Sequence, residues 1–113
     1  FHTTGITVGI SESSAACAAE AMRLAKQAGW KTSFDVNYRA GLWDYAAAKK
    51  GCEPLMQLAD VIFIPLRDAR NLFLRDQQAS GRTVVQWLRN RFPQATVVVT
   101  CSADGAMASA DSE

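Results

Sequence analysis

The feature that most constrains this chain is the alternation of short, apolar, β-favouring runs with segments that favour helix. Strands are expected at residues 5–10, 30–36, 61–64 and 95–100, and helical segments separate them. Strands that alternate with helices build a mainly parallel sheet through right-handed crossovers, with helices on both faces. The sequence therefore predicts a doubly wound α/β fold, and 113 residues suffice for one domain with a modest core.

The helical segments carry start and stop signals. Residues 15–28 are rich in alanine, follow capping hydroxyls at 11–14 and end at Gly29. Asp44 is expected to cap a helix that stops at Gly51. The remaining segments are a short turn from Pro54 to Leu58, a helix at 66–74 begun by Pro65, a loop at 77–82, a helix capped by Thr83, and an antiparallel hairpin beginning at 105–110.

Polar side chains follow the end of the expected strand at 30–36. In an open parallel sheet, ligands bind where strands end at their carboxyl edge. Arg39 offers a planar five-donor group suited to a carboxylate or a phosphate, Asn37 can donate to and accept from a hydroxyl, and Asp35 can hold either of them. This set suits an anionic sugar.

Several segments resemble one protein family in the same order along the chain. Residues 35–39 read Asp-Val-Asn-Tyr-Arg and are followed by Leu-Trp at 42–43, Gly-Ile-Thr stands at 5–7, and a β-favouring run at 97–100 leads to Ala-Asp-Gly-Ala at 103–106. These motifs resemble the ribokinase-like (PfkB) carbohydrate kinases, and within them the 2-keto-3-deoxygluconate kinase branch. The resemblance implies that residues 1–113 are an interior part of one ribokinase-like α/β domain whose N-terminal and C-terminal parts are missing.

The resemblance also implies an activity, its cofactors and a substrate class. The full-length protein is expected to transfer the γ-phosphate of ATP, with Mg²⁺, to a hydroxyl of a sugar or sugar acid. By resemblance, Arg39 binds the substrate carboxylate or the phosphoryl group in transit, and Asn37 binds a hydroxyl. The alternative is a local turn in which Asp35 and Asn37 bond their own backbone and Arg39 packs over Trp43.

At the end of the strand at 61–64, the family carries Asn-x-x-Glu, which helps to organise phosphate and magnesium. This chain has Pro65 and Asp68 at those two positions. A carboxylate at the start of a helix could orient a magnesium-bound water, although aspartate reaches less far than glutamate. Asp68 could equally serve only to favour the helix dipole.

After the strand at 95–100, the family has a Gly-x-x-Gly turn along the nucleotide. This chain carries Ser102, Asp104 and Gly105 in that turn, so the first glycine is absent. A hydroxyl at Ser102 could bond phosphate or ribose, whereas a plain hairpin turn built on Asp104 and Gly105 is the other interpretation.

The family's catalytic base and phosphate-binding amides come from a Gly-Ala-Gly-Asp segment that opens a helix. This chain contains no such segment. Phosphoryl transfer to a hydroxyl needs a base and donors for the moving charge. We therefore expect no catalytic residue within residues 1–113 and no activity from this piece alone.

Composition narrows the choice of partners. The formal net charge is +1, with basic and acidic residues interspersed, which argues against a nucleic-acid partner. No apolar run approaches the roughly 20 residues that cross a bilayer, so neither a membrane partner nor a location outside the cytoplasm is expected.

His2 is the sole histidine, and the three cysteines lack zinc-site spacing, so free thiols are expected. A homo-oligomer of the full-length protein stays open.

Two other functions fit parts of the pattern. A noncatalytic homologue that binds a sugar or a protein partner would explain the departures at Pro65, Asp68 and Ser102. A receiver-type signalling domain has a similar length and alternation, but it needs further carboxylates near its first strand and a later lysine, which this chain does not supply.

Overall fold

The structure, a computed structural model, describes residues 1–74, 76–101 and 105–108. Its centre is a five-stranded sheet in the order β1-β2-β3-β4-β5, in which the first four strands are parallel and β5 is antiparallel to β4. The strands are β1 (His2–Thr4), β2 (Ser33–Asp35), β3 (Val61–Pro65), β4 (Thr96–Thr100) and β5 (Ala106–Ala108). The α/β class with a mainly parallel sheet is confirmed, as is the hairpin that β5 makes with β4.

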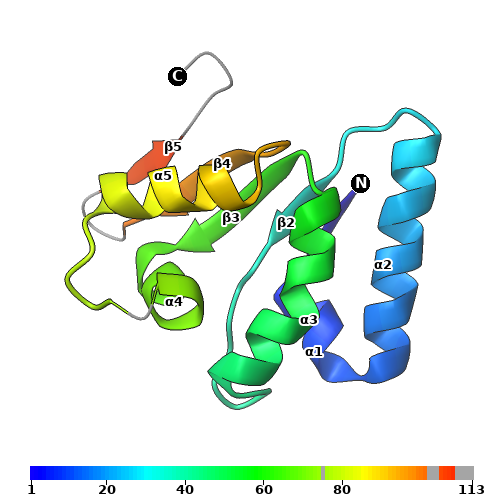
Figure 1. The fold of residues 1–113 in the computed structure, drawn as a ribbon. Helices are drawn as coiled ribbons and strands as arrows, with labels where there is room; N and C mark the ends of the chain where they lie inside the picture. The colour runs from blue at the N-terminus through cyan, green and yellow to red at the C-terminus, as the bar shows by residue number, and fades with distance from the viewer. Residues whose placement is uncertain (75, 102–104, 109–113) are drawn as a thin grey trace.

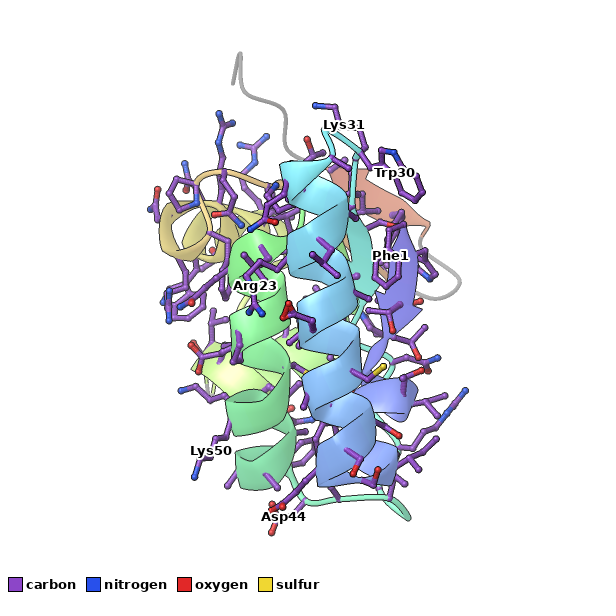
Figure 2. All side chains as sticks on the ribbon, turned by 90° about the vertical axis from the view of Figure 1, so that its right-hand side faces the viewer. Phe1, Arg23, Trp30, Lys31, Asp44 and Lys50 are labelled. Carbon is purple, nitrogen blue, oxygen red and sulfur yellow. The ribbon has the colours of Figure 1, made fainter. Side chains whose placement is uncertain are left out.

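The helices α2, α3 and α5 cover the same face of the sheet (Figures 1 and 2). Because consecutive strands are neighbours, right-handed crossovers place every connecting helix on that face. The sequence predicted helices on both faces of the sheet, whereas the described helices cover one face.

Within the described part of the chain, no helix is both long and apolar enough to cross a membrane. The helical elements are α1 (Gly5–Ile10), α2 (Glu12–Gln27), α3 (Tyr45–Leu58), α4 (Leu66–Ala69), the π-helical turn η1 (Arg70–Leu74) and α5 (Gly81–Arg91).

The core lies between the sheet and these helices. Alternate strand residues point into it, and Phe34, Ile62 and Val97 have no exposed surface. Met56 and Leu88 close it from the helical side. Burying each large apolar side chain contributes about 1.5–3 kcal/mol, so this one layer holds the strands in register.

The strand expected at residues 5–10 is wrong, because these residues form helix α1 and the strand precedes them as β1. The β-branched residues of this segment favour a strand, but the neighbouring β2 ends at Asp35, opposite Thr4, and leaves no partner beyond it. Gly5 turns the chain there. A Cβ on Gly5 would lie 1.9 Å from the carbonyl oxygen of Val36, so only glycine permits this approach.

The stop expected at Gly51 and the separate turn at Pro54 are also wrong. A single helix, α3, runs through both residues, and Asp44 caps it as expected by accepting from the backbone N–H of Ala47 at 2.8 Å. Gly51 serves packing instead of termination, since a Cβ there would lie 2.6 Å from the Trp43 ring. Proline removes one intrahelical hydrogen bond, yet α3 continues through Pro54 to Leu58.

Other boundaries differ by a few residues. Helix α2 starts after Ser11, which caps it at 3.0 Å, and the chain leaves it at Gly29, whose φ is +82°. The cap of α5 is Ser80, not Thr83, because the Ser80 hydroxyl accepts from the Thr83 N–H. The expected strand at 30–36 shrinks to β2, and the expected helix at 66–74 is divided into α4 and η1. The three cysteines are free, as expected, although only Cys52 is buried.

A polar network fixes the amino end of the sheet. Asp60, just before β3, accepts from the backbone N–H of Thr32 at 2.8 Å and from the Lys26 ammonium at 3.1 Å. Its backbone carbonyl accepts from Thr96 N–H at 2.8 Å, so one residue ties three strands and α2 together. Burial alone would raise the pKa of Asp60, but the Thr32 N–H and the Lys26 ammonium outweigh it and hold the pKa below 3.8.

This network predicts a pH-dependent loss of stability in the variant Asp60→Asn. Because the folded pKa lies below the ordinary value, the carboxylate stabilises the fold above about pH 4 and ceases to do so as the pH falls through the folded pKa. Since the pair is partly exposed, we expect Asp60→Asn to cost about 1 kcal/mol at pH 7 and progressively less toward pH 3. Thermal unfolding across this pH range measures the difference, and an equal loss at both ends would contradict it.

Candidate functional site

The carboxyl ends of the four parallel strands meet at one edge of the sheet, and the candidate residues follow two of them. Asp35 ends β2, and Asp68 lies in α4, which begins directly after β3. The main-chain N–H of Val36 donates to Phe63 O at 3.0 Å, so β2 and β3 stay paired up to this edge. The structure thus brings the segments 35–39 and 65–68 together, as expected for strand ends of a parallel sheet.

Asp35 is the electrostatic centre of this edge. Burial raises the pKa of Asp35, and the nearby Asp68 carboxylate raises it further. The hydrogen bond from the backbone N–H of Asn37 and the charges of His2 and Arg39 lower it, but the balance stays above 3.8. Asp35 therefore lies within electrostatic reach of both of the other charged residues proposed for this site.

The loop after β2 combines a local turn with an exposed cation. Asn37 has φ +42°, a left-handed conformation that asparagine tolerates better than most residues. Arg39 is exposed, and its guanidinium makes no hydrogen bond or ion pair with another residue of the described ranges. The bond from Asn37 to Asp35 fits the local-turn interpretation, whereas the free guanidinium of Arg39 fits a binding role.

In the part of the chain that the structure describes, no cation–ring contact joins the Arg39 guanidinium to the Trp43 ring. Trp43 packs against Gly9 and Gly51 on the helical side. The cation–ring contacts among the described residues are those of Lys49 and Arg91.

Asp68 is buried with half of its carboxylate unsatisfied. One carboxylate oxygen, Oδ1, accepts from Arg67 Nε at 3.2 Å, while Oδ2 is buried and has no hydrogen-bond partner among the residues that the structure describes. A buried, unsatisfied oxygen costs free energy, so such a group is typical of a site that receives a ligand atom. A favourable position in the first turn of a helix explains the charge of Asp68 but not this unpartnered oxygen.

A cleft of about 690 Å³ opens at the carboxyl ends of β3 and β4. Two arginines face it: Arg67, whose side chain is 70% exposed, and Arg70, which donates to Ala79 O at 2.8 and 2.6 Å. Gly105 lines the cleft with φ +92°, where a side chain would be strained. The other two residues predicted for this region, Ser102 and Asp104, lie outside the described residues.

The sequence analysis missed three contributors at this edge. Arg67 and Arg70 were not singled out, although two basic residues just after a strand are a readable signal for an anion cleft. Tyr38 stacks on Tyr45 with ring centroids 4.5 Å apart, and only the fold could reveal that pair. The described residues contain no cluster of three or more His, Cys, Asp or Glu that could hold a metal by themselves.

Known proteins resemble this chain in sequence and in fold. The model of the family described as pfkB family carbohydrate kinase matches residues 1–113. A 2-dehydro-3-deoxygalactonokinase from Haloferax volcanii is 39% identical over 108 residues, which are 96% of this chain and 33% of that protein. The chain thus spans about a third of the length of this curated relative.

Solved structures match over the same share of length. The crystal structure of a PfkB family carbohydrate kinase from Listeria grayi is 31% identical with a TM-score of 0.78, covering 88% of this chain and 31% of that one. That of a PfkB protein from Polaromonas sp. JS666 is 27% identical with a TM-score of 0.85, covering 98% and 37%.

The charges around Asp35 predict opposite titration shifts in two variants. Removing the like charge with Asp68→Asn should lower the pKa of Asp35, whereas removing the opposite charge with Arg39→Met should raise it. The ¹³C shift of the Asp35 carboxyl carbon, assigned with Asp35→Asn, measures both. Shifts in the same direction, or no shift in either variant, would show that the three side chains do not share one site.

Proposed function

Because this chain belongs to the pfkB family of carbohydrate kinases, we propose that it is part of a longer enzyme that phosphorylates a 2-keto-3-deoxy sugar acid with MgATP. The observation that carries the proposal is the exposed guanidinium of Arg39, which lies within electrostatic reach of Asp35 and pairs with no other described residue, at the edge of the sheet where ligands bind. The relative from Haloferax volcanii, named for a 2-dehydro-3-deoxy sugar acid, supports the substrate class. Such a kinase is expected to act in the cytoplasm.

Asp35, Asn37 and Arg39 each have a role in this proposal. The planar fork of Arg39 suits a sugar carboxylate or a phosphoryl group in transit, which lysine would contact at one point only. Asn37, turned by its left-handed backbone, offers an amide to a sugar hydroxyl. Asp35 fixes the turn through the Asn37 N–H and orients Arg39 by its charge.

Asp68 and the adjacent cleft suit the phosphate side of the reaction. The unpartnered Oδ2 of Asp68 can accept from a magnesium-bound water, and Mg²⁺ is commonly held by one or two carboxylates together with substrate phosphates. When bound, Mg²⁺ would neutralise charge on the phosphates. Arg67 and Arg70 would add positive charge at the cleft, and we place the nucleotide edge at Ser102, Asp104 and Gly105.

The proton acceptor for the sugar hydroxyl lies outside this chain in our proposal. Residues 1–113 lack the Gly-Ala-Gly-Asp segment expected of the family, so we assign no catalytic residue here and expect phosphorylation only from the longer protein.

A noncatalytic homologue is the second candidate. Pro65 and Asp68 stand where the family pattern expects asparagine and glutamate, and proline offers no side-chain amide to the phosphate network. Such a protein would bind the sugar acid without consuming ATP. The receiver-type alternative loses its basis, because the family match covers the whole chain.

The role of Arg39 predicts a substrate-specific defect. In the full-length enzyme, Arg39→Lys should raise the KM for the sugar acid about tenfold and Arg39→Met about a hundredfold, the range expected for one or two charge-assisted hydrogen bonds. The KM for ATP should change less than twofold. Steady-state kinetics measure these values, and Arg23→Met in α2 is the matched control, because Arg23 is exposed and its one ion pair among the described residues is with Glu20.

A neutral sugar separates the carboxylate from the phosphoryl group as the partner of Arg39. If Arg39 binds the carboxylate, Arg39→Met should be much less impaired with a sugar lacking one. Equal impairment with both sugars would assign Arg39 to the phosphoryl group, and unchanged KM and kcat in Arg39→Lys would refute the role entirely.

A further inference from the structure

Tyr38, which lies between the two proposed sugar-binding residues, is held by a contact outside its own loop. Its ring stacks on Tyr45, the first residue of α3, at 4.5 Å between centroids and 24° between planes. Tyr38 is half-buried against the core. Partial burial raises the pKa of Tyr38, and the neighbouring Tyr45, Asp44 and Asp68 raise it further. Because Asn37 and Arg39 flank Tyr38 in the chain, the orientation of its ring limits how both can move.

Tyr45 is held in turn from the segment that follows β3. Its hydroxyl accepts a hydrogen bond from Asn71 Nδ2 at 3.0 Å, and Asn71 Oδ1 accepts from the Gln77 side chain. Asn71 belongs to η1, which continues directly from α4 and therefore from Asp68. The side chains of Tyr38, Tyr45 and Asn71 link the two halves of the candidate site, and we call this set the bridge.

Helix α3 has an N-terminal cap that does not involve the side chain of Tyr45. Asp44 already caps the helix, and Tyr45 is 38% exposed. On the other side, Asn71 lies in a π-helical turn, a rare geometry that is frequent at functional sites. A partly exposed aromatic side chain and an irregular helical turn thus connect the segment after β2 with the segment after β3.

We propose that Tyr45 is a positioning residue that sets the spacing between the sugar-binding segment 35–39 and the segment carrying Asp68. This inference rests on the proposed function. Tyr45 contacts neither substrate nor nucleotide in it. Through Tyr38 it holds Arg39 and Asn37 in the orientation that binds the sugar acid, and through Asn71 it ties that orientation to the phosphate side of the site.

Two variants of Tyr45 in the full-length enzyme separate its ring from its hydroxyl. Tyr45→Leu removes the stack and should raise the KM for the sugar acid about three- to tenfold, the range that one aromatic pair converts to. Tyr45→Phe keeps the stack and should restore most of the affinity, with a KM within about threefold of wild type. The KM for ATP should stay within twofold in both variants.

A matched control removes a polar contact at the opposite end of the sheet. Thr32→Val deletes the hydroxyl that bonds Leu58 O and Asp60, so it should lower the thermal midpoint without changing the KM for the sugar acid. If Tyr45→Leu and Thr32→Val lower the midpoint equally and leave KM equally unchanged, Tyr45 is structural only and the proposal fails.

Amide hydrogen exchange tests the bridge without relying on turnover. In Tyr45→Leu, exchange should accelerate both in residues 37–43 and in residues 70–74, because the bridge joins them. Acceleration confined to the start of α3 would overturn the bridge. A wild-type enzyme that phosphorylates no sugar acid would overturn the proposed function and the positioning role together, whereas an active Tyr45→Leu enzyme with an unchanged KM overturns only the latter.

Discussion

The parallel pairing of β2 with β3 is the constraint on which the candidate site depends. Phe34 faces Ile62 across this pair, and both are fully buried, so the register is held by apolar packing. A slip of one residue would turn Asp35 into the core and Phe34 out of it, because side chains alternate between the two faces of a strand. The correct register ends both strands at one edge and brings Asp35 within electrostatic reach of Asp68.

The two ends of this sheet differ in how their carboxylates are hydrogen-bonded. At the amino end, Asp60 has satisfied partners on neighbouring strands and on α2, and its pKa lies below the ordinary value. At the carboxyl end, Asp68 has a buried oxygen without a hydrogen-bond partner in the described ranges, and Asp35 has a raised pKa. Hydrogen-bonded polar groups stabilise a fold, whereas buried polar groups without a partner and carboxyls with raised pKa values are frequent at functional sites. We therefore propose the carboxyl end as the side of the sheet that receives a ligand.

Local sequence patterns predicted the parts of the fold that local energetics decide. The apolar runs of β3 and β4 and the caps Ser11 and Asp44 were correct because burial and side-chain capping act within a few residues. Two predictions were wrong: the strand at residues 5–10 and the helix end at Gly51. The close approach of Gly5 to Val36 and the packing of Trp43 against Gly51 decide the structure there.

The same limit applies to the candidate site. Asp35, Asn37 and Arg39 could be read from the sequence because they follow one strand directly, and their roles stay predictions. The stack of Tyr38 on Tyr45 and the bond from Asn71 could not, since three separate segments supply them and only the sheet brings these together. Contacts between distant segments depend on topology, which local propensity does not encode.

The most direct measurement is a crystal structure of the full-length protein with a 2-keto-3-deoxy sugar acid and a non-hydrolysable ATP analogue. We expect two charge-assisted hydrogen bonds of about 2.7–2.9 Å from the Arg39 guanidinium to the sugar carboxylate or the γ-phosphate. We also expect Asp68 beside the bound magnesium and its waters. A sugar acid bound elsewhere, with Arg39 extended into solvent, would refute the proposed site.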